Sequence, residues 1–272
     1  MRLFIFGLGY AASAIADASG APLLATTRDG RDGTTRFDDE AAVRAGLAAA
    51  THILSSVPPA EDVDPVLASY GDALHGKWLG YLSSTGVYGD AAGAWVDETA
   101  PICGRRAARN AADAAWLALG ARVFRLPGIY GPGRSPLDRV ASGKAHRTGI
   151  PDQVFSRIHV ADIASGVVAG FTAPPGAYNL ADDRPCSQDE VIEHAAAMLG
   201  VSPPPVVSLN SLSPAARAFY AENRRVANGK AKRVLGWHPL YADYRLGLRA
   251  VSAITNPTAA SAAPPAASMD QR

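Results

Sequence analysis

The chain has 272 residues, 48% of them hydrophobic and 19% charged, which is enough apolar surface for one large α/β domain and excludes a disordered protein. Its 26 lysines and arginines balance 25 acidic residues, so the net charge of +1 gives no reason to expect nucleic acid or an acidic membrane as a partner. No apolar run approaches the roughly 18 residues of a membrane span. We therefore expect a soluble, cytoplasmic protein.

Metal and disulfide chemistry find little support in the sequence. Cys103 and Cys186 are the only cysteines, and no C-x-x-C pair is present. The six histidines lie far apart along the chain, without the short spacings typical of metal ligands. We expect neither a disulfide nor a metal site.

The first 130 residues alternate short apolar runs with helical patterns, which is typical of βαβ units and a parallel sheet. Strands are expected at 3–6, 22–27, 34–37, 52–56, 78–83 and 122–126. Helices are expected at 10–19, 40–50, 63–74 and 105–119. The pattern predicts a Rossmann fold, a doubly wound parallel sheet with helices on both faces.

The pattern changes after residue 130. A turn-rich loop at 131–136 is followed by expected helices at 160–171, 187–199, about 215–223 and 230–235, and by a strand at 178–180. From residue 254 the chain is Ala, Pro, Ser and Thr without periodicity, which predicts a disordered tail over 254–272. We expect one domain at 1–253, with a small C-terminal substrate lobe formed mainly from about 131–160 and 176–250.

The first strand runs into a G-x-G-x-x-A turn and then a helix, the context that a dinucleotide-binding turn requires. Gly7 permits the tight turn, and Gly9 lets the backbone approach a pyrophosphate beside Tyr10 at the start of the helix. Small Ala12 lets the helix pack closely on the strand. The alternative is an ordinary strand–turn–helix corner without a ligand.

The end of the second strand bears on the choice of cofactor. An NAD-specific protein usually carries an acid there for the ribose 2′-hydroxyl, whereas this chain has Thr26, Thr27 and Arg28. Arg28 can bind a 2′-phosphate with both arms of its guanidinium, and the threonines can donate hydrogen bonds to it. A shift of one residue would instead place Asp29 there, so NADP is favoured and NAD stays possible.

The end of the strand at 52–56 passes beneath the cofactor in folds of this kind. Here it carries Ser55, Ser56 and Val57 before two prolines. A polar strand end that turns sharply suits a contact with the ribose, although it is also consistent with a simple loop.

Five segments in order resemble the extended short-chain dehydrogenase/reductase superfamily, which includes the NAD(P)-dependent sugar-nucleotide epimerases and dehydratases. They are SSTGVYGD at 83–90, RLPGIYGPG at 125–133, RIHVADIA at 157–164, YNLAD at 178–182 and KAKRVLGWHP at 230–239. The resemblance covers residues 1 to about 250. It implies the Rossmann fold, a nicotinamide cofactor in contact with Pro127, and a substrate cleft under the C-terminal lobe.

The resemblance also places the catalytic residues. The family uses a Ser or Thr, then a tyrosine, and a lysine four residues later that lowers the pKa of the tyrosine. Ser84 occupies the hydroxyl position with Thr85 beside it, whereas Arg105 stands where the tyrosine is expected and Arg109 where the lysine is expected. The stretch 102–113 contains no tyrosine.

Arginine stays protonated and offers no lone pair, so it cannot exchange the proton that accompanies hydride transfer. Arg105 and Arg109, one helical turn apart, can instead hold a phosphate or a carboxylate, or they can be a solvated helix face. Near the expected cleft, Arg157 can bind an anionic substrate. His159 can titrate near neutrality or simply pack under a helix start.

Other residues near the strand ends could supply a base, although each is more often structural in such a place. They are Tyr88, Tyr130, Asp97 and Glu98. In the sugar-nucleotide relatives, an arginine near the position of Arg224 or Arg225 can touch the substrate diphosphate.

Two functions are compatible with these residues. The first is an NAD(P)-dependent oxidoreductase or epimerase that acts on an anionic or sugar-nucleotide-like molecule. The second is a non-catalytic NADP(H)-binding sensor, which the absence of the tyrosine and lysine favours. The Ala-rich helix at 105–119 could pair two copies of the chain as a homodimer, or pack closely on its own sheet.

Overall fold

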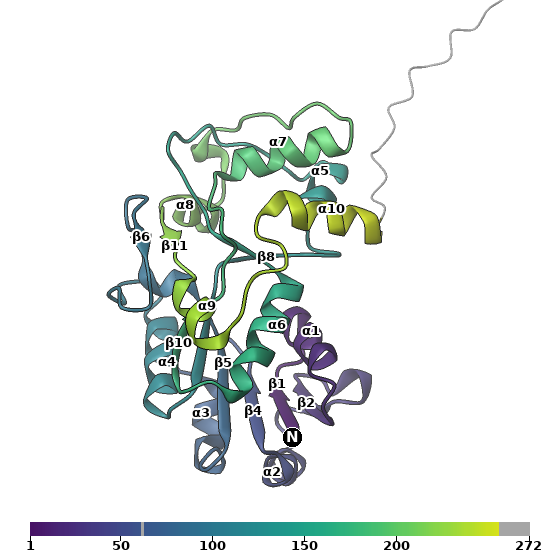
Figure 1. Ribbon diagram of the computed structural model, residues 1–272, viewed down its shortest axis with the longest axis vertical. Helices are drawn as coiled ribbons and strands as arrows, with labels where there is room; N and C mark the ends of the chain where they lie inside the picture. Colours follow the sequence, from purple (N-terminus) through teal and green to yellow (C-terminus); the bar gives the residue numbers. More distant parts are fainter. Residues whose placement is uncertain (61–62, 256–272) are drawn as a thin grey trace, which may run out of the picture.

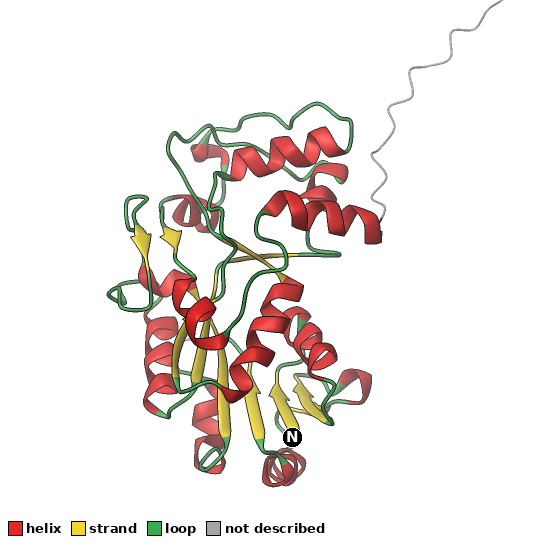
Figure 2. Ribbon diagram, viewed as in Figure 1, coloured by secondary structure: helices red, strands yellow, loops and turns green. Residues whose placement is uncertain are grey.

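The structure is a computed structural model that describes residues 1–60 and 63–255. A parallel sheet of seven strands forms its centre, in the order β10-β7-β5-β4-β1-β2-β3 (Figures 1 and 2). The strands are β1 (Leu3–Phe6), β2 (Leu23–Thr27), β3 (Thr35–Arg36), β4 (His52–Ser55), β5 (Trp78–Ser84), β7 (Arg122–Leu126) and β10 (Gly176–Asn179). The order reverses between β1 and β4, which is where a doubly wound sheet binds its ligand.

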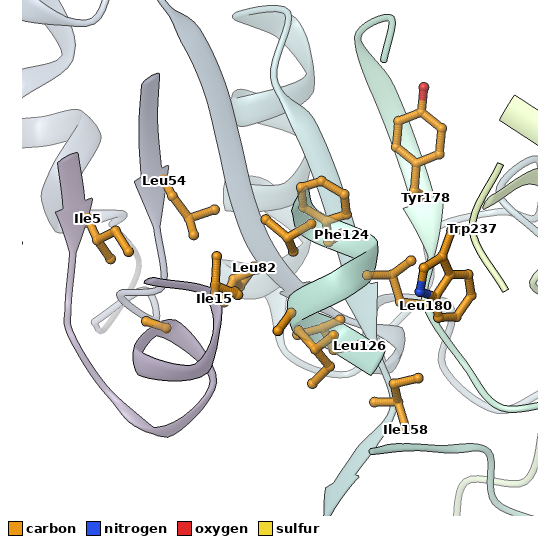
Figure 3. Packing of buried hydrophobic residues seen from close by; sticks show 14 of the residues in the cluster. Ile5, Ile15, Leu54, Leu82, Phe124, Leu126, Ile158, Tyr178, Leu180 and Trp237 are labelled. Carbon is orange, nitrogen blue, oxygen red and sulfur yellow. The ribbon is translucent and has the colours of Figure 1, made fainter. Parts of the chain in front are cut away.

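Helices cover both faces of this sheet. One face carries α1 (Tyr10–Ser19), α6 (Val160–Ala169) and α9 (Gly229–Leu235), whose apolar side chains pack on those of the strands (Figure 3). The other face carries α2 (Glu40–Ala49), α3 (Pro65–Tyr70) and α4 (Ala107–Ala118). Successive residues of a strand point to opposite faces, and accordingly Ile5 joins the first layer while Phe4 and Phe6 join the second.

A smaller lobe with its own apolar core lies beyond the carboxyl ends of the strands (Figure 1). Its core helices are α5 (Pro136–Ala141), α7 (Gln188–Met198) and α10 (Tyr244–Thr255), and α8 (Pro214–Tyr220) lies in the same upper part. Two short parallel pairs complete the fold: β8 (Gly128–Tyr130) with β9 (Arg157–His159), and β6 (Trp95–Val96) with β11 (Arg225–Val226). These pairs tie the lobe to the sheet.

A buried ion pair joins α4 to the sheet. The Arg125 guanidinium donates to both carboxylate oxygens of Asp113, at 2.7 and 3.1 Å, and the side chains are 3% and 1% exposed. Ser83 donates to the same carboxylate, and Arg125 also donates to the hydroxyl of Tyr88. Such a network is stable only when every member is paired, so it fixes α4 on β5 and β7.

The Rossmann fold expected from the sequence is confirmed, and β1 and α1 have the predicted bounds. The helix expected at 63–74 is shorter: Asp64 caps it, Pro65 opens it, and the chain tightens into a 3₁₀ turn at Gly71–Ala73. Sequence reasoning missed α5, α10 and the two short strand pairs. Since α10 extends to Thr255, it passes the expected tail start at 254, and the rest of that tail, 256–272, lies outside the described residues.

Within residues 1–60 and 63–255, no helix combines the length and the apolar character needed to cross a membrane.

Candidate functional site

The glycine turn after β1 is packed on one side and open on the other. Gly7 has a φ of +80°, which favours glycine, and a Cβ there would lie 3.0 Å from Val57 Cγ2 and 3.2 Å from Ser56 Oγ. Gly9, the N-cap of α1, has nothing within 4 Å of the place a Cβ would take. A ligand can therefore approach the backbone at Gly9.

The start of α1 fits an anion. Gly9 provides no side-chain cap, and the first turn of the helix contains no acidic residue. Free backbone N–H groups and the positive end of the helix dipole therefore face the open side of the turn. This is the arrangement that holds a dinucleotide pyrophosphate in folds of this type.

Ala12 and Tyr10, which the sequence predicts as cofactor contacts, make contacts that stabilise the fold. Ala12 is buried against the sheet, as close helix packing requires. The Tyr10 hydroxyl donates to the Pro132 carbonyl at 3.0 Å and so joins α1 to the loop after β8.

At the end of β2, Arg28 is exposed, and among the described residues its guanidinium makes no hydrogen bond or ion pair. Asp29, the rival candidate, is also exposed but pairs with Arg31 at 3.3 Å. Arg28 therefore remains available to an incoming phosphate, whereas the carboxylate beside it already has a cation.

The two threonines before Arg28 do not have the free hydroxyls that the sequence suggested. Thr26 and Thr27 are both buried, because β2 lies inside the sheet. The Thr26 hydroxyl accepts from the N–H of Gly7, and Thr27 shares a hydrogen bond with Thr34 at 2.7 Å. Their burial argues against the expected donation to a 2′-phosphate, which stays a prediction.

The end of β4 supports the glycine turn from below. The Ser56 hydroxyl donates to the Gly7 carbonyl, and Val57 packs where a Cβ of Gly7 would lie. The Ser55 hydroxyl is buried and has no hydrogen-bond partner among the described residues. These three positions shape the turn on which a cofactor would rest.

A cavity of about 250 Å³ lies where the carboxyl edge of the sheet meets the lobe. Five predicted site residues line it together with Pro127: Ser84 and Thr85 at the end of β5, and Arg105, Arg109 and Arg157. The structure thus brings together residues that lie up to 73 positions apart in the chain, from Ser84 to Arg157.

The two hydroxyls at the end of β5 differ in their bonding. The Ser84 hydroxyl accepts from the N–H of Gly86 at 3.1 Å and opens a short 3₁₀ turn. Thr85 is only 4% exposed, yet its hydroxyl has no hydrogen bond among the described residues, and it lines the cavity.

Arg105 and Arg109 do not lie one turn apart on a helix, as the sequence suggested. Helix α4 begins at Ala107, with Arg106 as its N-cap in an extended conformation. The reason lies just before it: the N–H groups of Cys103 and Gly104 both bond to the Val87 carbonyl, which holds the chain extended. Arg105 therefore reaches the cavity from a loop.

Arg105 and Arg224 already share a carboxylate. Both pair with Glu222, at 2.8 and 2.7 Å, and Arg224 also donates to the Gly89 carbonyl. Arg109 instead donates to the Tyr81 hydroxyl at 3.2 Å. Arg224, which the resemblance suggested, lies in the cavity, whereas Arg225 is not among its lining residues.

Arg157 and His159 are held by the protein itself. The buried Arg157 guanidinium donates to the carbonyls of Phe155, Cys186 and Ser187 and to the Gln188 side chain. His159 caps α6 through Nδ1, and burial lowers its pKa to about 4. The expected titration near neutrality is therefore wrong, and His159 does not line the cavity.

None of the other base candidates lines the cavity. The Tyr88 hydroxyl is bonded to Arg125 and Asn179, and that of Tyr130 is buried, where desolvation raises its pKa. Asp97 accepts from Thr99, and Glu98 accepts from the N–H of Asn179.

The lining also holds residues that sequence reasoning missed: Arg106, Phe155, Gln188, Phe219 and Glu222. Arg106 adjoins a predicted residue and could have been found by considering neighbours of the motif. Phe155 and Phe219 lie 64 positions apart in the chain, in segments without a recognisable motif. Only the fold brings them together.

No family model matches the chain. One curated protein, the 3-diazoavenalumate denitrifying reductase of Streptomyces sp, is 30% identical over 138 residues, which are 46% of this chain and 45% of that protein. The chain thus spans less than half the length of this relative.

Solved structures match over nearly the whole chain. A conserved protein of unknown function from Silicibacter pomeroyi DSS is 41% identical, with a TM-score of 0.81 over 93% of this chain and 99% of that one. The human epimerase family protein SDR39U1 with NADPH has a TM-score of 0.73 at 17% identity, over 93% of this chain and 99% of that one. The UDP-glucose 4-epimerase of Thermus thermophilus with NAD has a TM-score of 0.69 at 19% identity, over 94% and 99%.

Proposed function

Because this chain belongs to the same family as the conserved protein from Silicibacter pomeroyi and has the fold of the NAD-dependent epimerases and dehydratases, we propose an enzymatic function for it. The protein is an NADP(H)-dependent oxidoreductase or epimerase that acts on an anionic small molecule. The observation that carries this proposal is the open glycine turn at Gly9, at the same sheet edge as a cavity lined by Ser84 and Thr85.

The residues present fit a nicotinamide dinucleotide. The turn at Gly7 and Gly9 with the N-terminus of α1 would hold the pyrophosphate, and Ser55, Ser56 and Val57 support the turn from below. A bound nicotinamide supplies hydride transfer. Pro127 and the β5 hydroxyls would then lie between cofactor and substrate.

Arg28 supports NADP over NAD. It follows β2, at the place where the ribose of the adenosine would lie, and it has no partner among the described residues. A guanidinium binds a 2′-phosphate with two parallel hydrogen bonds, whereas a ribose hydroxyl would leave this cation uncompensated. Asp29 keeps NAD as the alternative, although its pairing with Arg31 weakens that alternative.

The proposed enzyme differs from its superfamily in acid–base chemistry. Among the described residues that line the cavity there is no tyrosine, lysine or histidine. Arginine cannot give up its proton at any working pH, so Arg105 and Arg109 would bind and orient rather than transfer a proton. Glu222 is the one carboxylate among these lining residues, and it is paired with Arg105 and Arg224, so a proton that the reaction requires would come from solvent or through this carboxylate.

A second candidate function follows from the same observation. A protein that binds NADP(H) and has neither the tyrosine nor the lysine of the superfamily in its cavity could report the NADPH level to a partner without catalysis. The presence of a well-formed cavity favours the enzyme, because a sensor has no need of a substrate site.

The proposal is tested by titrating the full chain with NADPH and with NADH, using the wild type and Arg28→Ala. We expect tighter binding of NADPH, and a loss of about 10- to 100-fold in Arg28→Ala for NADPH alone, since hydrogen bonds to charged groups contribute about 1.5–3 kcal/mol. Arg139→Ala, another exposed arginine without an ion pair among the described residues, is the matched control.

Absence of binding by either nucleotide would overturn the proposal. If NADPH binds, its oxidation in the presence of carbonyl compounds that carry an acid group separates the enzyme from the sensor. Turnover of any of them supports the enzyme, and binding without turnover across the panel supports the sensor.

A further inference from the structure

The cavity is strongly cationic. Its lining in the described part of the chain includes five arginines, at positions 105, 106, 109, 157 and 224, and a single acidic residue, Glu222. Guanidinium groups gathered at this density repel one another unless anions lie between them. One glutamate compensates only part of this charge, so the cavity favours an anionic ligand.

The five arginines differ in how much of their hydrogen-bonding capacity is free. Arg157 donates through both of its NH2 groups to three backbone carbonyls, the Cys186 sulfur and the Gln188 side chain, and Arg105 and Arg224 share Glu222. Arg109 makes only the hydrogen bond to the Tyr81 hydroxyl, and Arg106 makes none among the described residues. Arg106 and Arg109 are therefore the two arginines whose charge is neither paired with a carboxylate nor surrounded by backbone carbonyls among the described residues.

Arg109 is oriented from behind by aromatic side chains. Tyr81, which is fully buried, stacks on Trp116 with ring centres 5.4 Å apart and planes 7° apart. The Trp116 indole N–H in turn donates to Asp64 at 2.8 Å. This chain of contacts fixes the Tyr81 hydroxyl and, through it, one arm of the Arg109 guanidinium.

Two further groups point to the same place. Thr85 is 4% exposed and lines the cavity, and its hydroxyl has no hydrogen bond among the described residues, so it is available to a ligand there. Helix α4 begins at this cavity with no side-chain cap and no acidic residue in its first turn. Its first N–H groups and its dipole favour a negative charge there.

An apolar wall faces these donors. Phe155 and Phe219 both line the cavity and stack on each other, with ring centres 4.7 Å apart and planes 12° apart. Phe219 remains 49% exposed, so one of its faces is free for a flat ligand. The volume of about 250 Å³ lies below the roughly 300–1,000 Å³ of sites for drug-sized ligands, which favours a compact molecule over a sugar nucleotide.

We propose that Thr85, Arg106 and Arg109 form an oxyanion site, which binds a carboxylate or phosphate group of a compact substrate whose flat, apolar body packs on Phe219. This inference rests on the proposed function only in taking the cavity as the substrate site. Arg109, at the position where the resemblance places the lysine of the proton-transfer pair, thus serves here to bind and orient the substrate by its charge.

The test measures binding of simple probes to the full chain by calorimetry, with and without NADP⁺. The probes are benzoate, phenyl phosphate and the neutral benzyl alcohol. The variants are Arg106→Gln, Arg109→Gln and Thr85→Val, with Arg139→Gln as the matched control outside the cavity. Arg106 has no partner to lose, so its variant leaves the fold intact.

We expect at least one aryl anion to bind and benzyl alcohol not to bind. Each arginine variant should weaken binding about tenfold or more, and Thr85→Val severalfold, while the control stays at the wild-type affinity. Tighter binding of phenyl phosphate identifies a phosphate ester as the natural ligand, and tighter binding of benzoate identifies a carboxylic acid.

The proposal is overturned if neither aryl anion binds in the presence or absence of NADP⁺, or if both arginine variants bind as the wild type does. A failure of NADP⁺ itself to bind, with aryl anions still held by Arg106 and Arg109, would count against the proposed cofactor and leave the oxyanion site standing.

Discussion

The substitution Gly9→Ala separates the cofactor site from the stability of the fold. Gly9 has φ −101° and ψ −170°, an extended conformation that alanine adopts without strain, and a Cβ there would meet nothing within 4 Å. The new methyl group would nevertheless lie on the open side of the turn, where a pyrophosphate must approach the backbone.

The effect on stability should be small. Alanine is a poorer N-cap than glycine by up to about 1 kcal/mol, and it lowers the entropy of the unfolded chain by about 0.4–1 kcal/mol. These terms oppose each other. The melting temperature should therefore stay within about 2–4 °C of the wild type.

The effect on binding should be large. Hydrogen bonds from backbone N–H to phosphate oxygens require about 2.7–3.2 Å between heavy atoms, and a methyl group on the approach path forces the phosphate away. Loss of two charge-assisted hydrogen bonds, at about 1.5–3 kcal/mol each, predicts at least 100-fold weaker binding of NADPH.

Nucleotide titration and thermal melting of the same preparations check this prediction. Gly71→Ala is the matched control, because Gly71 also has a negative φ and open space around a Cβ but lies beside α3, outside the site. Gly7→Ala should instead destabilise the protein, since φ is +80° and Val57 is 3.0 Å away. Wild-type affinity in a stable Gly9→Ala protein would refute the placement of the pyrophosphate.

Two further predictions concern buried charges in the fold. Burial raises the pKa of Asp182 to about 8, so between pH 4 and about 8 the native state holds a proton that the unfolded state has released, and stability falls as pH rises through this window. Urea unfolding across this window should show a shallower decline for Asp182→Asn than for the wild type, and equal slopes would contradict the assignment. Asp113→Asn leaves the Arg125 cation buried without its counter-charge, so about 3–5 kcal/mol of stability should be lost, with unchanged stability arguing against the pair.

The sequence was most informative where local rules and tertiary structure agree. The bounds of β1 and α1 followed from an apolar run, two glycines and a helical pattern, because a glycine turn ends the strand and opens the helix in one step. The helix predicted at 187–199 begins with a serine at the cap position, and the Ser187 hydroxyl accepts from the N–H of Glu190 at the start of α7. Such signals lie within a few residues of one another.

Short strands that form only by pairing with a distant segment could not be predicted from the sequence. β8 and β9 have three residues each and pair across a gap that has no strand pattern of its own. By contrast, α10 could have been found, since Tyr244, Leu248 and Val251 recur at helical spacing and are buried in the lobe. No helix was predicted over residues 244–253, and the last two residues of α10 were placed in the predicted tail.

In the candidate site, too, local motifs were informative, whereas contacts between distant segments could not be predicted. The motif positions named Ser84, Thr85, Arg105 and Arg109, and all four line one cavity. The helical register assumed for the arginines was wrong, because a contact 17 residues away, between Gly104 and Val87, delays the start of α4. Sequence spacing therefore predicted residues that line one cavity, but not the backbone geometry that presents them.

This geometry decides what the arginines can do. Two arginines one turn apart on a helix would present parallel side chains to a single surface. With Arg105 in a loop and paired to Glu222, the unpaired charges belong to Arg106 and Arg109 at the start of α4, and the unused hydroxyl of Thr85 lines the same cavity. The anion is then met by a helix N-terminus and two guanidinium groups at once, an arrangement that aligns a substrate by charge and requires no proton transfer from the protein.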